Sequence, residues 1–378
     1  MIYLDNSATT FPKPQYVTLA VNRALREYGF NPGRGGYRQS VVTAQRIFEA
    51  RSLIKDFFGM ANEENVIFTG GCTQALNTVI KGFLHKGDHV VISSFEHNAV
   101  LRPLQSLKDS GMITYSAAEV VPGDDDRTLS NFRKAINAKT RLFVCTHASN
   151  VFGNILPTKR LCALAHHYGV LFCLDAAQTA GVLPINMQED GYDFVCCAGH
   201  KYLYGPMGTG LLLIGEDRAL DPLIEGGTGS ESADARMPSY YPDRLEAGTL
   251  NVPGIFGLSA GVRFVKEQGI EQIYRKETRL ITRLHERLNS IKGVTVYGKG
   301  EGIRSVPVLA FTLDKTDSEK AASMLGEKFG VAVRGGLHCA PLAHRSMGTI
   351  ERGVVRVAPS VFTTEREIAL FANAVERL

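Results

Sequence analysis

Lys201 lies in a Gly199-His200-Lys201 turn between two apolar runs, 193–197 and 211–214, and this turn has the clearest chemical potential in the chain. Both runs have the continuous apolar character of strands that are buried on both faces. Burial disfavours the ammonium form of a lysine and leaves an amine that can attack a carbonyl carbon. An ordinary exposed turn lysine is the alternative interpretation of this segment taken alone.

Two other strand-like runs end in residues suited to hold an anion and a flat ring. The run 66–68 is followed by Thr69-Gly70-Gly71-Cys72-Thr73 and a predicted helix, so backbone N–H groups, the helix dipole and the Thr73 hydroxyl are placed to bind a phosphate. The run 89–92 is followed by His97, whose imidazole can stack on a ring or move a proton. Either feature by itself also fits a structural role.

Asp175 follows the run 170–174, and an aspartate at the end of a buried strand is costly unless it pairs with a positive group or caps a helix. A protonated pyridine nitrogen is such a group. Because the carboxyl ends of parallel strands meet at one edge of an open α/β sheet, we expect Asp175, His97, Lys201 and the anion-binding turn to lie together. Groups for a phosphate, a pyridine ring and an aldehyde together predict pyridoxal 5'-phosphate as cofactor.

The elements that position these residues alternate between apolar strands and helical patterns from about residue 65 to residue 215. This alternation predicts an α/β fold with a mostly parallel sheet flanked by helices. The stretch 226–253 is rich in Gly, Ser and Pro and is long for a structureless loop, so we expect it to have a task. Beyond it we predict one long charged helix, Val262–Leu288, then strands and a last helix from about Glu365.

The change of pattern near residue 261 predicts two domains. We predict a large cofactor-binding domain over 13–260 and a smaller α+β domain over 261–378. We expect the N-terminal segment 1–12 to associate with the small domain.

Nearly the whole chain, from Tyr3-Leu4-Asp5-Asn6-Ser7-Ala8-Thr9-Thr10 to the segment around Arg356, resembles the class V aminotransferase family of fold-type-I pyridoxal phosphate enzymes. The resemblance is to its cysteine desulfurase and selenocysteine lyase branch. It implies that Lys201 bonds the cofactor aldehyde, that Asp175 faces the pyridine nitrogen and that His97 stacks over the ring. It also implies further cofactor contacts: Asn150 and Gln178 at the ring hydroxyl, and the backbone near Cys72 with Thr73 and His200 at the phosphate.

Residues 246–249 resemble the family segment in which a threonine, here Thr249, reaches the phosphate of the neighbouring subunit. The resemblance therefore implies a homodimer with shared active sites and gives the stretch 226–253 its task.

Cys339 lies in a loop, 334–341, with two glycines and a proline, and it is the only cysteine that we predict outside a strand, a helix or the glycine turn. A partly exposed thiol beside Arg334 and His338 is accessible as a thiolate. The loop resembles the Arg-x-Gly-x-His-Cys loop of the second desulfurase group, whose cysteine takes the sulfur. An incidental loop cysteine and a zinc-site fragment with His344 are the alternatives, although the metal ligands are too few and poorly spaced.

The predicted reaction converts L-cysteine to L-alanine, with transfer of the sulfur to Cys339 as a persulfide. Lys201 and His97 are the predicted acid–base groups. The resemblance implies that Arg356 binds the substrate carboxylate at two points, and Asn150 and Arg334 are the other predicted substrate contacts. L-selenocysteine is an alternative substrate, and a sulfur-acceptor protein is an expected partner. Another class V reaction, such as transamination or epimerisation, and a weakly active sulfur-transfer partner that binds the cofactor are the competing functions.

Three residues depart from the family pattern. Ala198 replaces a serine that bonds the phosphate, and Cys72 replaces a common threonine. Tyr37, in the segment Asn31-Pro32-Gly33-Arg34-Gly35-Gly36-Tyr37, replaces a histidine beside the cofactor. We expect the lost hydroxyl at Ala198 to weaken cofactor retention by about 0.5–1.5 kcal/mol.

Composition excludes several other classes of function. The 378 residues carry a net charge of only +4 and no long basic run, so we expect no nucleic acid partner. The N-terminus lacks the pattern of a signal peptide, and no apolar run reaches the roughly 20 residues of a membrane span. Seven cysteines without a disulfide-framework spacing predict a cytoplasmic protein, and those in apolar runs are predicted core residues: Cys145, Cys173, Cys196 and Cys197.

Overall fold

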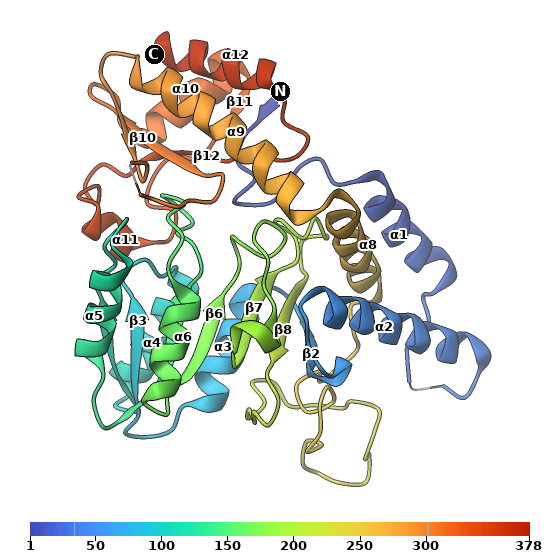
Figure 1. Cartoon of the computed structure of the whole chain (residues 1–378). Coiled ribbons are helices and arrows are strands. Elements are labelled where there is room, and N and C mark those ends of the chain that lie inside the picture. The colour runs from blue at the N-terminus through green and yellow to red at the C-terminus, as the bar shows by residue number, and fades with distance from the viewer. Residues whose placement is uncertain (34, 301) are drawn as a thin grey trace.

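The computed structural model describes residues 1–33, 35–300 and 302–378, so Arg34 of the Asn31–Tyr37 segment lies outside the described residues. Its centre is a seven-stranded sheet with the order β2-β8-β7-β6-β5-β3-β4 (Figure 1). Strands β3 to β7 run parallel, and β8 is antiparallel to both of its neighbours, β7 and β2. The strands are β2 (Val66–Thr69), β3 (His89–Ser93), β4 (Thr114–Ala118), β5 (Thr140–Thr146), β6 (Leu171–Asp175), β7 (Phe194–Ala198) and β8 (Gly210–Ile214).

The central sheet has an apolar core on each face, which explains the continuous apolar runs. Val90 and Ile92 of β3 belong to one core and Val91 to the other. Helices α3 (Cys72–Phe83) and α4 (Asn98–Asp109) contribute to the first core, and α5 (Asp125–Ala135) and α6 (Thr158–His167) to the second. The four cysteines predicted in the core are fully buried, which confirms that prediction: Cys145, Cys173, Cys196 and Cys197.

The remaining elements form a helical group at one end of the central sheet and a smaller α+β unit above it (Figure 1). The helical group comprises α1 (Gln15–Glu27), α2 (Arg38–Phe57) and α8 (Val252–Gln268), and the short elements η1 (Glu63–Asn65) and α7 (Met187–Asp190) lie in loops of the central unit. A three-stranded antiparallel sheet, β12-β10-β9, carries the smaller core, and strand β1 pairs with β11. The elements of this unit are β1 (Ile2–Tyr3), α9 (Ile270–Asn289), β9 (Val294–Tyr297), β10 (Leu309–Leu313), α10 (Ser318–Phe329), β11 (Val331–Ala332), α11 (Pro341–Ser346), β12 (Val355–Val357) and α12 (Glu365–Glu376).

The prediction of a single helix over Val262–Leu288 is wrong. The chain forms two helices, α8 and α9, which are separated at Gly269. Gly269 has a φ of 80°, a left-handed conformation that ends a helix and that glycine adopts without steric cost. The limits 1–12, 13–260 and 261–378 stay a prediction, and the limit at residue 260 falls inside α8.

No helix among the described residues is long and apolar enough to cross a membrane.

A buried glutamate, Glu277 of α9, gives the fold a pH-dependent stability. Its carboxyl group faces the Tyr204 hydroxyl and makes no hydrogen bond of good geometry with the described residues. Burial raises the pKa of Glu277 well above its ordinary value of 4.5. The folded state therefore holds a proton that the unfolded state releases above about pH 4.5, and stability falls as pH rises from there toward the folded-state pKa.

We expect the variant Glu277→Gln to gain stability over the natural protein as pH rises, because the amide has no proton to lose. Between about pH 5.5 and pH 8 the difference in free energy of unfolding should shift in favour of the variant. Urea unfolding of both proteins at the two pH values measures this difference. If the two proteins differ in free energy of unfolding by the same amount at both pH values, Glu277 is ionised in the folded protein.

Candidate active site

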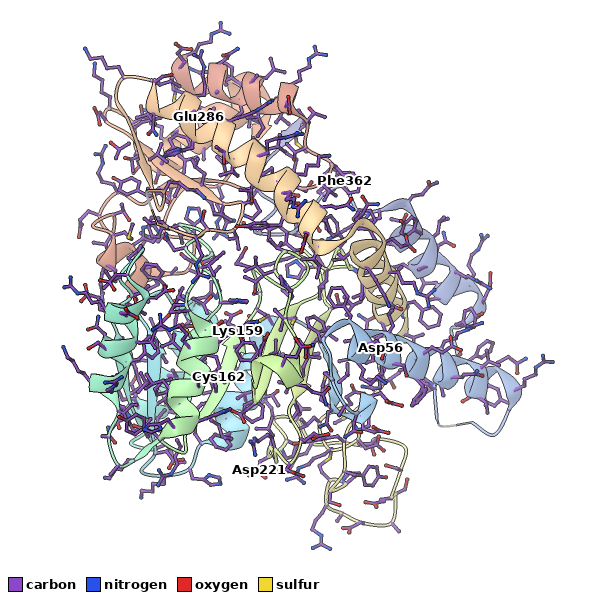
Figure 2. The ribbon with its side chains drawn as sticks, viewed as in Figure 1. Asp56, Lys159, Cys162, Asp221, Glu286 and Phe362 are labelled. Atoms are coloured by element: carbon purple, nitrogen blue, oxygen red, sulfur yellow. The ribbon has the colours of Figure 1, made fainter. Side chains whose placement is uncertain are left out.

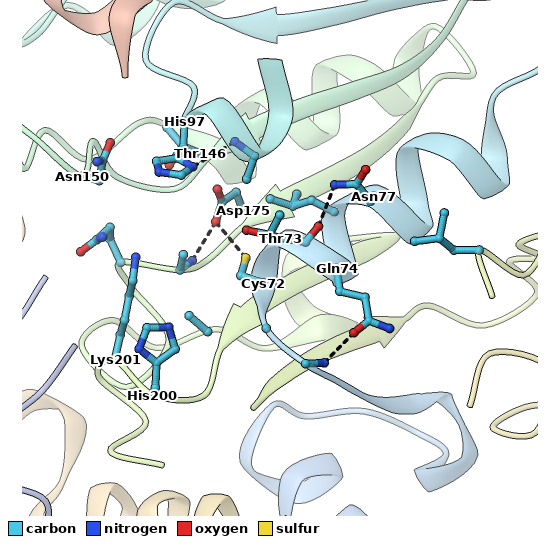
Figure 3. A pocket seen from close by; sticks show the side chains of 18 residues that line it. Cys72, Thr73, Gln74, Asn77, His97, Thr146, Asn150, Asp175, His200 and Lys201 are labelled. Atoms are coloured by element: carbon cyan, nitrogen blue, oxygen red, sulfur yellow. Dashed lines mark hydrogen bonds between the residues drawn. The ribbon is translucent and has the colours of Figure 1, made fainter. Parts of the chain in front are cut away.

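A cavity of about 600 Å³ opens at the carboxyl edge of the parallel strands (Figure 3). It receives residues from the ends of β5, β6 and β7, from the start of α3, and from the segment just before α4. Eight of the nine predicted cofactor-binding residues line it: Cys72, Thr73, His97, Asn150, Asp175, Gln178, His200 and Lys201. The ninth, Thr249, is exposed elsewhere on the chain.

Lys201 stands directly after β7, in a turn that the Gly205 N–H closes by donating to the Gly199 carbonyl oxygen at 2.8 Å. The lysine is partly buried and borders the cavity beside His200 (Figure 3). Burial lowers the pKa of Lys201, and the negative charge of Asp175 opposes that shift. The sequence-based prediction of a lysine with a destabilised ammonium group is therefore confirmed in direction.

Asp175, at the end of β6, uses one carboxylate oxygen for two hydrogen bonds, and its other oxygen makes none with the residues that the structure describes. Its Oδ1 accepts hydrogen bonds from the Ala177 N–H at 2.9 Å and from the Cys72 thiol at 3.4 Å. Burial raises the pKa of Asp175, whereas the Ala177 bond and the charge of Lys201 lower it. The alternative that Asp175 caps a helix is wrong, because a turn follows β6 and the next helix begins only at Met187.

His97 is held by its own backbone at the start of α4. Its Nδ1 accepts a hydrogen bond from the Ala99 N–H at 3.0 Å, so this nitrogen carries no proton. Burial and the nearby charge of Lys201 lower the pKa of His97 to about 4. The imidazole is therefore neutral near pH 7, with its proton on Nε2, and that N–H is left to act on a ligand.

The turn that is predicted to bind an anion has the local structure that the sequence predicts. Helix α3 begins at Cys72, after Gly71 with a φ of 156°, and the N–H groups of a first helical turn lack intrahelical acceptors. Two buried polar atoms of cavity-lining residues have no hydrogen-bond partner among the described residues, His200 Nδ1 and Gln178 Oε1. Such atoms are costly unless a ligand satisfies them, and a phosphorylated, hydroxyl-bearing pyridine fits both their chemistry and the free oxygen of Asp175.

The Cys339 loop contacts a residue that lines the cavity, Asn150, and is fixed by backbone contacts. The Cys339 carbonyl oxygen accepts from the Asn98 N–H at 2.7 Å, and the His338 carbonyl oxygen accepts from Asn150 Nδ2 at 2.8 Å. His338 and Cys339 adopt left-handed backbone conformations, with φ of 49° and 57°, which cost non-glycine residues about 1–3 kcal/mol each. Cys339 is partly exposed, whereas the other six cysteines are buried.

The zinc-fragment alternative has no support in the described part of the chain. His338 is buried, with its Nε2 donating to the Val354 carbonyl oxygen at 3.0 Å. His344 pairs through Nδ1 with the Thr349 hydroxyl at 2.8 Å. Within that part no group of three or more His, Cys, Asp or Glu residues is placed to hold a metal ion.

Arg356, on β12 of the smaller unit, contacts the cavity-lining Asn150 and is only 2% exposed. Its Nη1 donates to the Asn150 carbonyl oxygen at 3.0 Å, and its Nη2 donates to Asp5 Oδ1 at 2.6 Å. Its Nε has no partner among the described residues. Arg334 lies beside it, because the Arg356 N–H donates to the Arg334 carbonyl oxygen at 2.8 Å, but the Arg334 side chain is exposed.

Two carboxylates near the site were missed by the sequence analysis, Asp5 and Glu96. Glu96 Oε1 accepts from the Thr146 N–H at 2.7 Å and so joins the segment after β3 to the end of β5. Burial raises its pKa to about 8. Neither residue stands in a pattern that separates it from an ordinary polar residue at the end of a strand.

The segment that carries Thr249 is anchored to the edge strand β2. Buried Arg51 forms an ion pair with Glu246, whose Oε1 also accepts from the Phe68 N–H at 2.6 Å. Thr249 itself is exposed, and so is Tyr37, so neither joins the cavity within one chain.

Comparison with known proteins gives a consistent picture. The family model "Aminotransferase class-V" matches residues 2–371. A probable cysteine desulfurase of Methanothermobacter thermautotrophicus is 32% identical over all of this chain and 94% of its own length. A probable cysteine desulfurase of Mycolicibacterium paratuberculosis is 33% identical, and the chain spans only 55% of that protein. Among solved structures, the apo form of a cysteine desulfurase from Thermococcus onnurineus has a TM-score of 0.92 and 30% identity, covering all of this chain and 94% of that one.

Proposed function

The chain belongs to the class-V aminotransferase family, and from this premise we propose that it is a pyridoxal phosphate-dependent cysteine desulfurase. The reaction converts L-cysteine to L-alanine and transfers the sulfur to Cys339 as a persulfide. One observation carries the proposal. The backbone of the partly exposed Cys339 is bonded to Asn98, and that of its neighbour His338 is bonded to Asn150, which lines the same cavity as Lys201 and Asp175.

Pyridoxal phosphate fits the donors and acceptors of the cavity. The start of α3 with Thr73 and His200 would hold the phosphate, Gln178 and Asn150 the ring hydroxyl, and Asp175 the pyridine nitrogen. The free carboxylate oxygen of Asp175 and the unpartnered His200 Nδ1 support this assignment. When bound, the cofactor supplies an electron sink for removal of the substrate Cα proton.

Each residue then has a defined task. Arg356 binds the substrate α-carboxylate. Lys201 Nζ removes the Cα proton, for which its lowered pKa suits it, and the neutral His97 provides an N–H donor at Nε2. The Cys339 thiolate attacks the substrate sulfur, so that an Sγ–S bond forms as the Cβ–S bond breaks. The electron pair of that bond stays on Cβ, which takes up a proton equivalent to the one that the Cys339 thiol lost, and the three-carbon product leaves as L-alanine.

The experiment that tests the proposal is release of alanine and sulfide from L-cysteine by the purified protein loaded with pyridoxal phosphate. We expect both products in equal amounts when dithiothreitol is present, and slower turnover without it, because the persulfide must be cleared by a thiol. Absence of alanine from a protein that binds the cofactor would refute the desulfurase activity. Transamination and epimerisation assays on the same sample would then identify the alternative class-V reaction.

We also infer a homodimer in which Thr249 completes the site of the second copy. Helices α1 and α2 carry large exposed apolar side chains, namely Leu19, Leu25, Val41 and Phe48. Exposed apolar side chains are common where subunits meet. Light scattering is expected to give twice the 41.3 kDa mass of the chain, and a monomer would exclude sharing of the site.

The unpaired state of all seven cysteines supports a cytoplasmic location. L-selenocysteine has the same carboxylate and amine as L-cysteine, so it is proposed as an alternative substrate. A sulfur-acceptor protein is the proposed partner for the persulfide.

A further inference from the structure

We propose that Asp5 is a positioning residue for substrate recognition, which orients Arg356 to receive the α-carboxylate of the amino acid. This inference rests on the proposed function. It starts from the contact between Asp5 Oδ1 and Arg356 Nη2 at 2.6 Å, between residues 351 positions apart in the sequence. The Asp5 side chain is 20% exposed and that of Arg356 2% exposed, so water screens the pair poorly.

The guanidinium group of Arg356 is held at two of its three nitrogens. Nη1 donates a hydrogen bond to the Asn150 carbonyl oxygen and Nη2 donates one to Asp5 Oδ1. These two hydrogen bonds fix the plane of the guanidinium group. The third nitrogen, Nε, is buried and without a partner among the described residues. A charged donor left unsatisfied is costly, and a carboxylate arriving from the substrate would satisfy it. Because the plane is already fixed, little side-chain freedom is lost when the substrate binds.

The backbone around Asp5 connects both halves of the site. The Ala358 N–H donates to the Leu4 carbonyl oxygen at 2.7 Å, so Asp5 is fixed next to the strand that carries Arg356. A few residues later, the Thr10 hydroxyl donates to the Lys201 carbonyl oxygen at 2.9 Å. The N-terminal segment therefore sets the position of the Arg356 guanidinium relative to the turn that carries Lys201.

The charges around the pair agree with this role. Arg356 and Asp5 act on Lys201 with opposite signs, and Arg334 adds a further positive charge near His97. Without Asp5, an uncompensated guanidinium would face the lysine. Asp5 therefore orients Arg356 and offsets its positive charge. The N–H groups of Arg356 that Asp5 does not bind remain available to a ligand with a free carboxylate.

The test compares Asp5→Ala and Asp5→Asn in the cofactor-loaded protein, with L-cysteine and L-cysteine methyl ester as substrates. For Asp5→Ala we expect the KM for L-cysteine to rise about 10- to 100-fold, the range for a lost hydrogen bond to a charged group, with kcat changed less than about threefold. The KM for the ester, which has no carboxylate, should stay unchanged. Asp5→Asn keeps the Oδ1 acceptor and should recover most of the affinity for L-cysteine.

Asp56→Ala is the matched control, because Asp56 lies on the exposed side of α2, away from the cavity (Figure 2), and its side chain is 61% exposed. It removes the same charge and should leave both KM values unchanged. An unchanged KM for L-cysteine in Asp5→Ala, or an equal rise for the ester, would overturn the inference. If the alanine variant does not fold, Asp5→Leu takes its place, because leucine is close to aspartate in size and has no acceptor for Arg356 Nη2. A rise in the KM for L-cysteine but not for the ester then supports the inference, and unchanged KM values overturn it.

Failure of the proposed function is distinguishable from failure of this inference. If the natural protein releases no alanine from L-cysteine, the proposed function is wrong. In that case, calorimetric titration of the cofactor-loaded proteins with L-alanine tests the positioning role of Asp5 independently of turnover. Weaker binding by Asp5→Ala than by the natural protein supports the positioning role, and equal binding overturns it.

Discussion

Replacing Lys201 with alanine is expected to lower alanine release from L-cysteine by about 10⁴-fold or more, the upper end of what a positioned acid–base group contributes. Lys201 lines the cavity. Burial lowers the pKa of its amine, and the negative charge of Asp175 opposes that shift. No other side chain that lines the cavity is a lysine, so nothing among the described lining residues replaces it. The Asp175 and Thr73 positions remain intact, and we therefore expect the variant still to bind pyridoxal phosphate, although less tightly.

The measurement is single-turnover alanine formation, together with cofactor content after dialysis. Lys299→Ala is the matched control, because burial also lowers the pKa of Lys299 to about 8 but its amine contacts Ser305 in the smaller unit. That variant should keep turnover within about threefold of the natural protein. A Lys201→Ala protein with a tenth or more of normal activity would remove this lysine from the chemistry.

The central sheet was predictable because its strands are buried on both faces, which leaves a continuous apolar run in the sequence. Strand β4, Thr114–Ala118, was not predicted. It lies at the edge of the sheet, and its polar and small residues are partly exposed, so it lacks a continuous apolar run. The break between α8 and α9 was missed for another reason. The helical pattern of charges and apolar residues continues on both sides of Gly269, and only the backbone conformation there separates the two helices.

The candidate site was predictable to the extent that it follows from strand ends. Asp175 is the last residue of the parallel strand β6, and His97 and Lys201 follow the parallel strands β3 and β7 within about one turn, so topology alone brings them to one edge. The contact of Asp5 with Arg356 depends on the folding of segments at opposite ends of the chain, for which a single sequence carries no pattern. The proposed role of Thr249 depends on a second chain.

One departure from the family pattern has a different meaning in the structure than in the sequence. Cys72 was interpreted as a residue of the phosphate-binding turn that lacks a hydroxyl group. In the fold its thiol donates to Asp175 Oδ1, and it thereby helps to fix which oxygen of that carboxylate is available. Burial and the charge of Asp175 raise the pKa of Cys72, so it remains a thiol and a hydrogen-bond donor.

Replacing Cys339 with alanine is expected to remove sulfide production from L-cysteine almost completely, by about 10³-fold or more, as for loss of a reacting nucleophile. The thiol is the partly exposed one of the chain, and its loop is fixed against Asn98 and Asn150. Because the loop is held by backbone carbonyl groups, the alanine variant should keep its fold. Cofactor binding should also persist, since Cys339 lies outside the set that lines the cavity.

The decisive readout is the mass of the peptide that contains Cys339 after reaction with L-cysteine in the absence of a reductant. The natural protein should carry one added sulfur atom on this peptide. Cys162→Ala is the control, since Cys162 lies buried on α6, away from the cavity (Figure 2), and burial raises its pKa to about 12. It should leave both the added mass and the rate intact. Sulfide release that survives in Cys339→Ala without an added thiol would mean that the sulfur leaves directly from the substrate, and the chain would then act as a lyase without a persulfide on Cys339.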